Sequence, residues 1–366
     1  MLADTVDHPG GIGRYVREVL GALGGRDDVR LAVLTTSGGS ATVTRLAAST
    51  LDSLIVSPRA DQISLALWGR YRSGAAFARA GAEVIVGAKH LIPRTSRPTV
   101  LVVHDLLTIT RAHENALAKR ILLPRQYRRS LTDADRLVAV SAATRARLGE
   151  INRSWEAKCS IVPNGMSARL IDVEPERPAA VGSQPFALVV GDLSPRKNLA
   201  LLTRLWATAP PEDLRLVVVG PDSGTDAPVR RELLALERAG RVFWIRDAED
   251  PVLRWCYEQA RVVLFPTFEE GFGLPLLEAM TFHAPVVAST DLALFEVSAG
   301  DPRVVHVDPY DHDAWRTAIK NALVAGRTPR SPQLPDGAIT WREHTDRLIS
   351  IARELARGTP SPRTTS

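Results

Sequence analysis

The sequence lacks the features that mark several broad classes of protein. Its two cysteines, Cys159 and Cys256, are too few for a disulfide framework and do not have metal-ligand spacing. Aromatic residues make up only 5% of the chain, which argues against a stacking platform for single-stranded nucleic acid. No apolar run approaches the ~20 residues that a membrane-spanning helix needs. We therefore expect neither a disulfide scaffold nor a membrane-spanning protein, and no nucleic-acid partner.

A secretory signal is also missing from the start of the sequence. Residues 1–4, MLAD, lack the basic end and the apolar stretch of such a signal, so we expect a cytoplasmic protein. With 45% hydrophobic and 24% charged residues, the composition is typical of a globular chain. The formal net charge of +5 suits an acidic ligand or an anionic surface, although Arg-rich bacterial chains often share it.

The pattern along the chain predicts an α/β protein. Short β-rich apolar runs alternate with helix-length amphipathic stretches, which is typical of βα units around parallel sheets. In the first half, strands are expected at 31–35, 54–57, 84–87, 99–104, 137–141 and 160–163, and helices at 13–23, 61–80, 114–131 and 142–151. In the second half, strands are expected at 186–190, 214–220, 242–245, 262–265 and 285–288, and helices at 198–207, 227–239, 251–259, 274–282 and 311–324.

The length of 366 residues exceeds what one hydrophobic core usually serves and predicts two domains. Residues 172–185, DVEPERPAAVGSQP, contain three prolines and cannot form the interior of an element, so we place the linker there. It separates an N-terminal domain, 1–171, from a C-terminal domain, 186–338. Residues 339–357 predict one long helix that crosses back to the first domain, and 358–366 have the composition of a disordered tail. Two Rossmann-like, doubly wound domains would face a cleft at the carboxyl ends of their strands.

The stretch 266–280, PTFEEGFGLPLLEAM, carries the strongest chemical pattern. It follows the expected strand 262–265, and its glycines and Pro275 suit a tight turn into a helix. Glu270 on the loop and Glu278 on the helix would flank the free N–H groups of a helix N-terminus. Such a place favours anions and polyhydroxylated ligands. A helix-start acid followed by an exposed glutamate explains the same spacing, and both interpretations stay open.

The segment EGFGLPLLE at 270–278 resembles the E-x7-E motif of the GT-B-fold retaining glycosyltransferases of the family 4 group. VVGDLSPRKNL at 189–199 looks like the first strand, loop and helix of that family's donor domain, and VVVG at 217–220 looks like its second strand. Further matches in the expected order are VAST at 287–290, Glu296-Val297, Asp308-Pro309, GGIGRY at 10–15, His104-Asp105, Ser141 and VPNG at 162–165. The resemblance covers the chain to about residue 355.

The resemblance implies a hexosyltransferase with the GT-B fold. It would move a hexose from a nucleotide-diphosphate sugar to a hydroxyl of a glycan or lipid-linked acceptor, with retention and without a metal. The SPRKN loop favours mannose-like donors. The alternatives are a GT-B-fold nucleotide-sugar epimerase, or a non-catalytic nucleotide- or glycan-binding relative.

The resemblance also assigns roles in the donor domain. Lys197 would be the diphosphate lysine with Arg196 assisting it, because a departing diphosphate needs fixed cations where no metal is present. Glu278 would bind the ribose hydroxyls and Glu270 would act at the transferred sugar. The backbone N–H groups of three residues are candidate contacts to the sugar hydroxyls: Phe272, Gly273 and Leu274. A solvated basic pair after a turn is the structural alternative for the two cations.

In the first domain, Gly11 and Gly13 of the GGIG loop would let the backbone approach the donor phosphates. His104, at the end of the apolar strand TVLVVHD, would touch the donor sugar or polarise the acceptor region. A simple turn and a satisfied structural histidine are the alternatives. Whether Asp105 assists His104 or caps the following segment is left open.

The sequence departs from the family pattern at four places, one of which is His283, where a small residue is common before the Ala-Pro-Val strand. Asp192 stands where many relatives have an arginine after the glycine, and Thr267 stands where serine is common. The stretch 243–247, FWIRD, lacks the usual glycine and does not identify the nucleotide base.

We expect no metal and no cofactor besides the donor substrate. The DxD matches at 133–135 and 311–313 fall at a helix end and a helix start, where solvated or capping carboxylates are common. The stretch 119–129, KRILLPRQYRR, packs five cations around apolar residues. It either contacts an anionic membrane, at the inner face of the cell membrane where a lipid-linked acceptor would be met, or forms a charged helix face over the acceptor domain.

Overall fold

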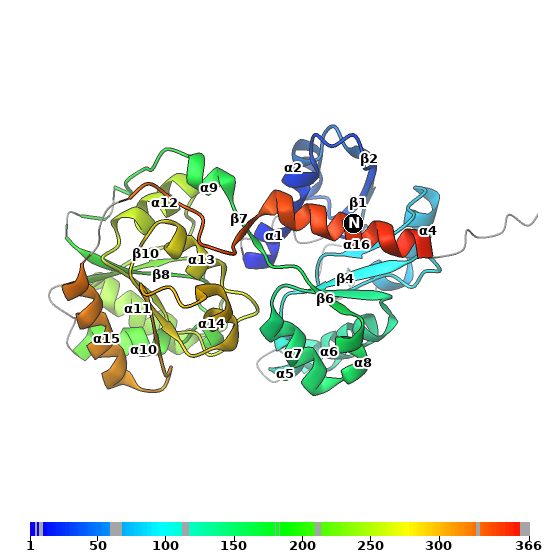
Figure 1. The fold of residues 1–366 in the computed structure, drawn as a ribbon. Helices are drawn as coiled ribbons and strands as arrows, with labels where there is room; N and C mark the ends of the chain where they lie inside the picture. Colours follow the sequence, from blue (N-terminus) through cyan, green and yellow to red (C-terminus); the bar gives the residue numbers. More distant parts are fainter. Residues whose placement is uncertain are drawn as a thin grey trace, which may run out of the picture. The chain divides into compact units, whose positions relative to one another are not determined.

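The structure is a computed structural model of the chain. It describes residues 1–3, 6, 10–58, 68–111, 117–179, 181–182, 184–208, 214–326 and 330–358. The chain folds into two compact units (Figure 1). One consists of Met1–Gly165 together with Thr340–Ser366, and the other of Met166–Ile339.

The first unit is built on parallel strands. β1 (Leu31–Thr35) pairs with β2 (Leu51–Val56). A second group has the order β3 (Ile85–Gly87), β4 (Thr99–Val103), β5 (Arg136–Ala139) and β6 (Cys159–Ile161). Leu2 forms parallel bridges to Leu34 of β1 and to Gly87 of β3, so the first residues of the chain join the two groups.

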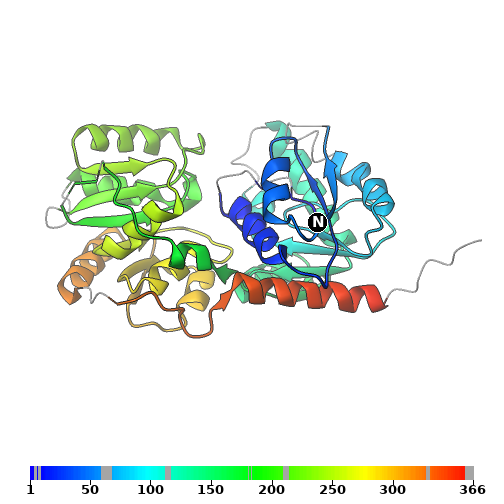
Figure 2. The same ribbon diagram turned by 90° about the horizontal axis from the view of Figure 1, so that it is seen from above.

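Helices of the first unit follow the strands in alternation. They are α1 (Gly11–Leu23), α2 (Ser40–Leu46), α4 (Ser73–Arg79), α5 (Leu107–Thr110), α6 (Leu117–Asp133), α7 (Ala142–Ile151), α8 (Arg153–Ala157) and α16 (Trp341–Gly358). The α1 helix buries one face, formed by Tyr15, Val16, Val19, Leu20 and Leu23, as its helical spacing requires. The C-terminal helix α16 packs against α1 (Figures 1 and 2).

The second unit contains one parallel sheet of six strands. Its strands are β8 (Phe186–Val190), β9 (Arg215–Val219), β10 (Val242–Ile245), β11 (Val262–Phe265), β12 (Val286–Ser289) and β13 (Val304–Val307). They lie in the order β10-β9-β8-β11-β12-β13, with parallel pairing throughout. The strand order therefore reverses between β8 and β11, as in a doubly wound dinucleotide-binding domain.

Helices cover both faces of this sheet (Figure 2). They are α9 (Ala168–Asp172), α10 (Leu199–Thr208), α11 (Ala227–Arg238), α12 (Asp250–Gln259), α13 (Leu274–Thr281), α14 (Leu292–Ser298) and α15 (His312–Ala325), with a 3₁₀ turn at Pro195–Lys197. On one face, Trp206 of α10 and Trp315 of α15 lie fully buried in the core. On the other face, Trp255 of α12 stacks on Phe186 at 5.7 Å. Residues that alternate along each strand thus reach two separate helical layers.

The boundary between the units lies earlier than the linker placed at 172–185. The chain passes from one unit to the other at 165–166 and returns at 339–340, and the short strands there, β7 (Gly165–Met166) and β14 (Ile339–Thr340), pair with each other. The segment after 166 belongs to the second unit because it is tied to α12. Arg254 donates hydrogen bonds to the carbonyls of Ile171 and Val173, and both contacts lie within that unit. The prolines of residues 172–185 indicated an irregular segment, but hydrogen bonds to α12 decide that the chain after residue 166 is part of the second unit.

Several elements were absent from the sequence prediction. Short helices such as α2 and α9 gave no long periodic pattern, and β13 is an edge strand whose residues are partly exposed. Its apolar signal was therefore weak. Residues 59–67 and 112–116, at the starts of two predicted helices, and the predicted tail at 359–366 lie outside the described residues.

Gly165 is expected to be essential for the packing of α16. A Cβ atom at this position would lie 2.2 Å from the backbone nitrogen of Trp341, so Gly165→Ala requires a backbone shift and should cost about 1–3 kcal/mol of stability. Urea unfolding monitored by tryptophan fluorescence measures this loss. The control is Gly21→Ala in α1, where a Cβ meets no atom of the described residues within 4 Å and the stability should stay the same or rise slightly. Equal stability of the two variants would contradict the packing argument.

Candidate functional site

The point where the strand order reverses carries the main candidate site. Loops after β8 and β11, the two strands that flank the reversal, hold most of the residues singled out in the second half of the sequence. In open α/β sheets, ligands bind outside the carboxyl ends of the strands at such a point. The fold therefore places these loops where a ligand is expected.

Two glycines let the loops after β8 and β9 pass close to each other. Gly191 has φ +154° and Gly220 has φ +147°, values that L side chains rarely adopt. A Cβ atom at Gly220 would lie 2.1 Å from the carbonyl oxygen of Gly191, so the close approach depends on glycine. Ser223 Oγ then donates a 2.7 Å hydrogen bond to Leu193 O, which fixes the two loops together.

Asn198 anchors the turn that carries the basic pair. It ends the 3₁₀ turn Pro195–Lys197 in the left-handed conformation, at φ 51°. Its buried side-chain Nδ2 donates to Pro266 O at 3.2 Å and to Pro309 O at 3.0 Å. The turn is thereby fixed to the loop that follows β11.

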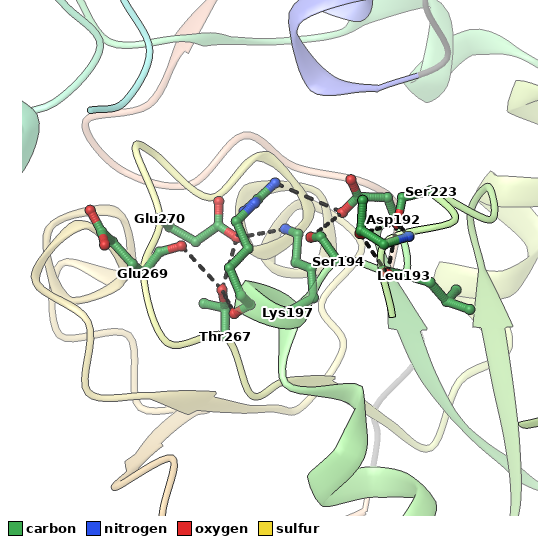
Figure 3. Close-up of polar contacts among 10 residues, drawn as sticks. Asp192, Leu193, Ser194, Lys197, Ser223, Thr267, Glu269 and Glu270 are labelled. Atoms are coloured by element: carbon green, nitrogen blue, oxygen red, sulfur yellow. Dashed lines mark hydrogen bonds and ion pairs between the residues drawn. The ribbon is translucent and has the colours of Figure 1, made fainter. Parts of the chain in front are cut away.

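Glu270 accepts hydrogen bonds from both basic side chains of this turn. Its Oε1 lies 2.5 Å from Lys197 Nζ and 2.8 Å from Arg196 Nη1. The Thr267 hydroxyl lies 3.1 Å from the same oxygen and 2.9 Å from Arg196 O. Figure 3 shows Lys197 and Thr267 directed at the Glu270 carboxylate. The structure thus brings three predicted site residues together and adds Thr267.

This ion-pair cluster is buried. Lys197 and Glu270 are each only 8% exposed, so the structural alternative of a solvated basic pair does not hold for Lys197. Burial by itself would raise the pKa of Glu270, but the positive charges of Lys197 and Arg196 outweigh it and lower the pKa to about 2. Burial lowers the pKa of Lys197, although Glu270 opposes the shift. Lys197 Nζ also lies 4.9 Å from the centre of the Phe265 ring.

Asp192 adds a second acid to the cluster. Its Oδ1 accepts a 2.9 Å hydrogen bond from Ser194 Oγ and lies 3.9 Å from Arg196 Nη2. Two cations and two carboxylates therefore balance in charge. Because many members of the resembled family have an arginine at the position of Asp192, this chain has one cation fewer here and one acid more.

The start of α13 also has the predicted form. Gly273 caps it with φ +103°, and a Cβ there would lie 2.7 Å from Leu294 Cδ2. Pro275 lies in the first turn, as the sequence indicated. Glu278 is 2% exposed and accepts a 2.6 Å hydrogen bond from Tyr257 Oη. The alternative of an exposed glutamate is therefore wrong.

In the first unit, His104 is a buried, neutral histidine. Its Nε2 lies 2.8 Å from Ala88 O, and a carbonyl can only accept, so Nε2 carries the hydrogen. Burial lowers the pKa of His104. Asp105 Oδ1 accepts a hydrogen bond from the backbone N–H of Leu107, the first residue of α5, and the charge of Asp105 opposes the lowering of the His104 pKa.

The glycine loop opens α1 as predicted. Gly10 is the N-cap and offers no side-chain oxygen to the helix N-terminus. A Cβ atom at Gly11 would meet nothing within 4 Å in the described part of the chain, so packing does not require glycine there. Gly13 lies two residues further along the helix and is buried.

Sequence reasoning missed three residues of the site in the second unit. Thr267 appeared only as a departure from the family pattern, and Asn198 only as a helix start. Tyr257 lies on α12, whose helical periodicity explains an aromatic residue without any site. The one signal in the sequence for Thr267 was its spacing, because it places a hydroxyl three residues before Glu270. Side chains of loop residues at this spacing often form a hydrogen bond.

The acidic pairs that resemble a metal motif have other partners. Asp311 caps α15 through a 2.9 Å hydrogen bond from Ala314 N, and Asp135 accepts from Thr99 N at 2.8 Å. Asp133 pairs with Arg70. Among the residues that the structure describes, no group of three or more His, Cys, Asp or Glu side chains has the geometry to hold a metal ion.

Two known families match the chain, one over each half. Residues 171–331 match the family described as glycosyl transferases group 1, and residues 9–169 match the one described as Glycosyltransferase Family 4. The O-antigen chain mannosyltransferase B of Escherichia coli is 30% identical over 285 residues, which cover 74% of this chain and 68% of that protein. The D-inositol 3-phosphate glycosyltransferase of Mycobacterium avium (strain 104) is 27% identical over 244 residues, which cover 62% of this chain and 56% of that protein.

Solved structures match over nearly the whole chain. A sucrose-phosphate synthase from Thermosynechococcus elongatus has a TM-score of 0.64 at 19% identity, with 97% of this chain and 95% of that chain covered. Anabaena HepE, solved in complex with UDP and glucose, has a TM-score of 0.65 at 15% identity, with 96% and 98% covered. At these identities the likeness concerns the fold.

Replacing Glu270 by glutamine should destabilise the second unit and change its response to acid. Glu270→Gln leaves the two cations without their shared carboxylate and should cost about 3–5 kcal/mol near neutral pH. Because the pKa of Glu270 is lowered on folding, its stabilising contribution is complete above its ordinary value of 4.5 and is lost as the pH falls towards about 2. The stability gap between wild type and variant should therefore narrow below about pH 4.5.

Urea unfolding between about pH 7 and pH 3 measures this gap. The matched control is Glu174→Gln, an exposed glutamate of the same unit, which should follow the wild type at every pH. A gap that stays constant with pH would contradict the lowered pKa of Glu270.

Proposed function

Because this chain belongs to the group 1 glycosyltransferases of family 4, we propose that it is a metal-independent, retaining hexosyltransferase. It is a GT-B-fold glycosyltransferase that uses nucleotide sugars. In the proposed reaction, it moves a hexose from a nucleotide-diphosphate sugar to a hydroxyl of a glycan or lipid-linked acceptor. The observation that carries the proposal is the ion-pair cluster at the strand reversal of the second unit, in which Arg196 and the buried Lys197 share the buried carboxylate of Glu270.

Lys197 and Arg196 act on the diphosphate. Its negative charge grows as the glycosidic bond breaks, and fixed cations in a dry site stabilise that charge strongly. The Lys197 ammonium has three N–H donors, so it can contact a phosphate oxygen while it keeps its hydrogen bond to Glu270. The anchoring of the turn by Asn198 keeps both cations in place before the donor binds.

Glu270 acts at the transferred sugar. Its carboxylate is held ionised by the two cations, so it can accept a hydrogen bond from a sugar hydroxyl or stabilise an oxocarbenium-like transition state. The N–H groups of Phe272, Gly273 and Leu274 lie at the N-terminal end of α13, where they suit further sugar hydroxyls. Thr267 holds the carboxylate in its orientation.

Glu278 binds the ribose of the nucleotide. It is a buried acid whose orientation is set by the hydrogen bond from Tyr257, and a carboxylate can accept from two neighbouring hydroxyls. In the first unit, His104 donates its Nε2 hydrogen to Ala88, so its Nδ1 is the atom that would accept a hydrogen bond from the transferred sugar or the acceptor. The N-terminus of α1, with Gly11 and Gly13, suits the donor phosphates.

A mannose-like donor and a surface glycan as acceptor agree with the similar curated proteins. These include O-antigen chain mannosyltransferases of Escherichia coli and Salmonella typhimurium. The SPRKN sequence of the donor loop favours the same sugar.

We further propose that α6 contacts an anionic membrane at the inner face of the cell membrane. Arg120, Arg125, Arg128 and Arg129 of this helix are exposed, and Ile121 beside them is 58% exposed. Cations around an exposed apolar side chain suit the headgroup region of such a surface. Within the described ranges of the chain, none of the helices is both long and apolar enough to cross a bilayer.

Removing Lys197 should abolish most of the turnover. Lys197→Ala removes a charge-assisted contact to the developing diphosphate and should lower kcat by about 100- to 1000-fold. The assay follows the release of GDP from GDP-mannose and of UDP from UDP-glucose, after a thermal-shift screen of both sugars has identified the better donor. Lys320→Ala, an exposed lysine of α15, is the matched control and should keep wild-type turnover. Full activity of folded Lys197→Ala would refute the diphosphate role.

Turnover should persist in a chelator. The proposal assigns the leaving-group charge to side chains, so EDTA followed by dialysis is expected to leave the rate of nucleotide release unchanged. Analysis of the product by NMR should show the anomeric configuration of the donor. Loss of activity that only added magnesium restores would contradict the metal-free mechanism, and an inverted anomer would contradict retention.

A further inference from the structure

His104 lies in a buried cluster of rings that comes from three separate segments. The Tyr15 ring of α1 packs edge-on against the His104 ring, with 4.5 Å between centres and 76° between planes. Tyr15 also makes edge contacts with His344 and Trp341 of α16, at 5.2 Å and 5.4 Å. All four residues belong to the first unit. The C-terminal helix thus reaches His104 through Tyr15.

The hydrogen bonds fix the direction of each proton in this cluster. His344 Nδ1 lies 2.7 Å from Pro163 O, and a carbonyl oxygen can only accept, so Nδ1 donates. Burial lowers the pKa of His344 to about 4, so the ring is neutral near pH 7 and its Nε2 is an acceptor. The Tyr15 hydroxyl, 2.9 Å from that Nε2, is therefore the donor.

These contacts leave the His104 ring with one orientation. The hydrogen bond from Nε2 to Ala88 O fixes one edge of the ring, and the T-shaped contact with the Tyr15 ring, 4.5 Å between centres, restricts the space in which the His104 ring can turn. Tyr15 is itself held at its hydroxyl by His344. Tyr15 is 1% exposed and His344 is fully buried, so water cannot replace the lost hydrogen bond if either side chain is changed.

We propose that Tyr15 is a positioning residue for His104, and that His344 of α16 positions Tyr15 in turn. The inference rests on the proposed role of His104 at the transferred sugar or the acceptor. Tyr15 acts by presenting the His104 imidazole, with its Nδ1 as acceptor, in a single orientation. Misplacement of a reacting group by about 1 Å can cost on the order of 100-fold in rate.

Other contacts of α16 provide a matched control. Asp28 forms an ion pair with Arg353 of α16, with 2.9 Å between the charged atoms. Asp28 also pairs with Arg26, and Arg26 in turn pairs with Asp346 of α16. These contacts hold the same helix in the same unit without any ring near His104. Asp28→Asn therefore weakens the docking of α16 and leaves Tyr15 in place.

A double-mutant cycle separates positioning from simple stabilisation. Release of GDP from GDP-mannose, or of UDP from UDP-glucose, is measured for wild type, Tyr15→Phe, Tyr15→Leu and Asp28→Asn, each with His104 and with His104→Ala. Tyr15→Phe keeps the ring and loses the hydroxyl, and should lower kcat roughly two- to tenfold. Tyr15→Leu loses the ring, and should lower kcat about 100-fold with little change in the donor KM. In the His104→Ala background, neither Tyr15→Phe nor Tyr15→Leu should lower kcat further. Asp28→Asn should have the same small effect on kcat whether residue 104 is histidine or alanine.

The outcomes are distinguishable. If Tyr15→Leu lowers the residual turnover of His104→Ala by the same factor as it lowers wild-type turnover, Tyr15 does not act through His104. That result would overturn this inference and leave the proposed function intact. His104→Ala with wild-type turnover would overturn the proposed role of His104, and the inference with it. Since Tyr15→Leu risks misfolding, ¹⁵N NMR of the histidine side chains in Tyr15→Phe gives a second measurement. Wild-type His104 should show the Nε2–H tautomer with sharp ring signals. In Tyr15→Phe, where His344 no longer holds the aromatic ring at position 15, the same tautomer should show shifted and broadened ring signals, and unchanged His104 signals would overturn the positioning role.

Discussion

The ion pair between Lys197 and Glu270 is the constraint on which the candidate donor site depends. Both groups are withdrawn from water, and such a pair is stable only when each charge keeps a partner in good geometry. Arg196 and Thr267 complete the arrangement around the same carboxylate oxygen. The partners are 73 residues apart in the sequence, so the pair also ties the loop after β8 to the loop after β11. The charges that the proposed function assigns to donor binding are thus the same charges that hold this edge of the sheet together.

The balance of charge in this cluster has a consequence for the chemistry. The negative charges of Asp192 and Glu270 balance the positive charges of Arg196 and Lys197, so these four side chains together carry no net charge. Two neighbouring cations without carboxylate partners would repel each other and lower the free energy of unfolding, whereas the paired side chains avoid this cost without a bound donor. A diphosphate that shares the N–H donors of Lys197 with Glu270 would meet cations that are already fixed in place. Under the proposed function, such preorganisation would lower the reorganisation needed as the leaving group gains charge.

The first unit follows a similar rule with neutral groups. His104, Tyr15 and His344 each have a hydrogen-bond partner that dictates the position of the proton, and burial keeps both histidines uncharged. In this unit orientation comes from ring packing and hydrogen bonds, whereas in the second unit it comes from ion pairing. Through His344 and Trp341, α16 contributes two of the rings that pack against Tyr15 in this cluster.

The sequence by itself determined the class of fold, most strands of the second unit and the residues of the E-x7-E motif. Alternation of buried apolar runs and amphipathic helices is a local property, and strands such as Phe186–Val190 and Val262–Phe265 lie where it placed them. Only the tertiary structure decided that Glu270 pairs with Lys197, that Tyr257 holds Glu278, and where one unit ends and the next begins. These outcomes depend on which strands become neighbours and on contacts between distant segments. Local periodicity does not encode such contacts, because the same apolar pattern is compatible with many strand orders.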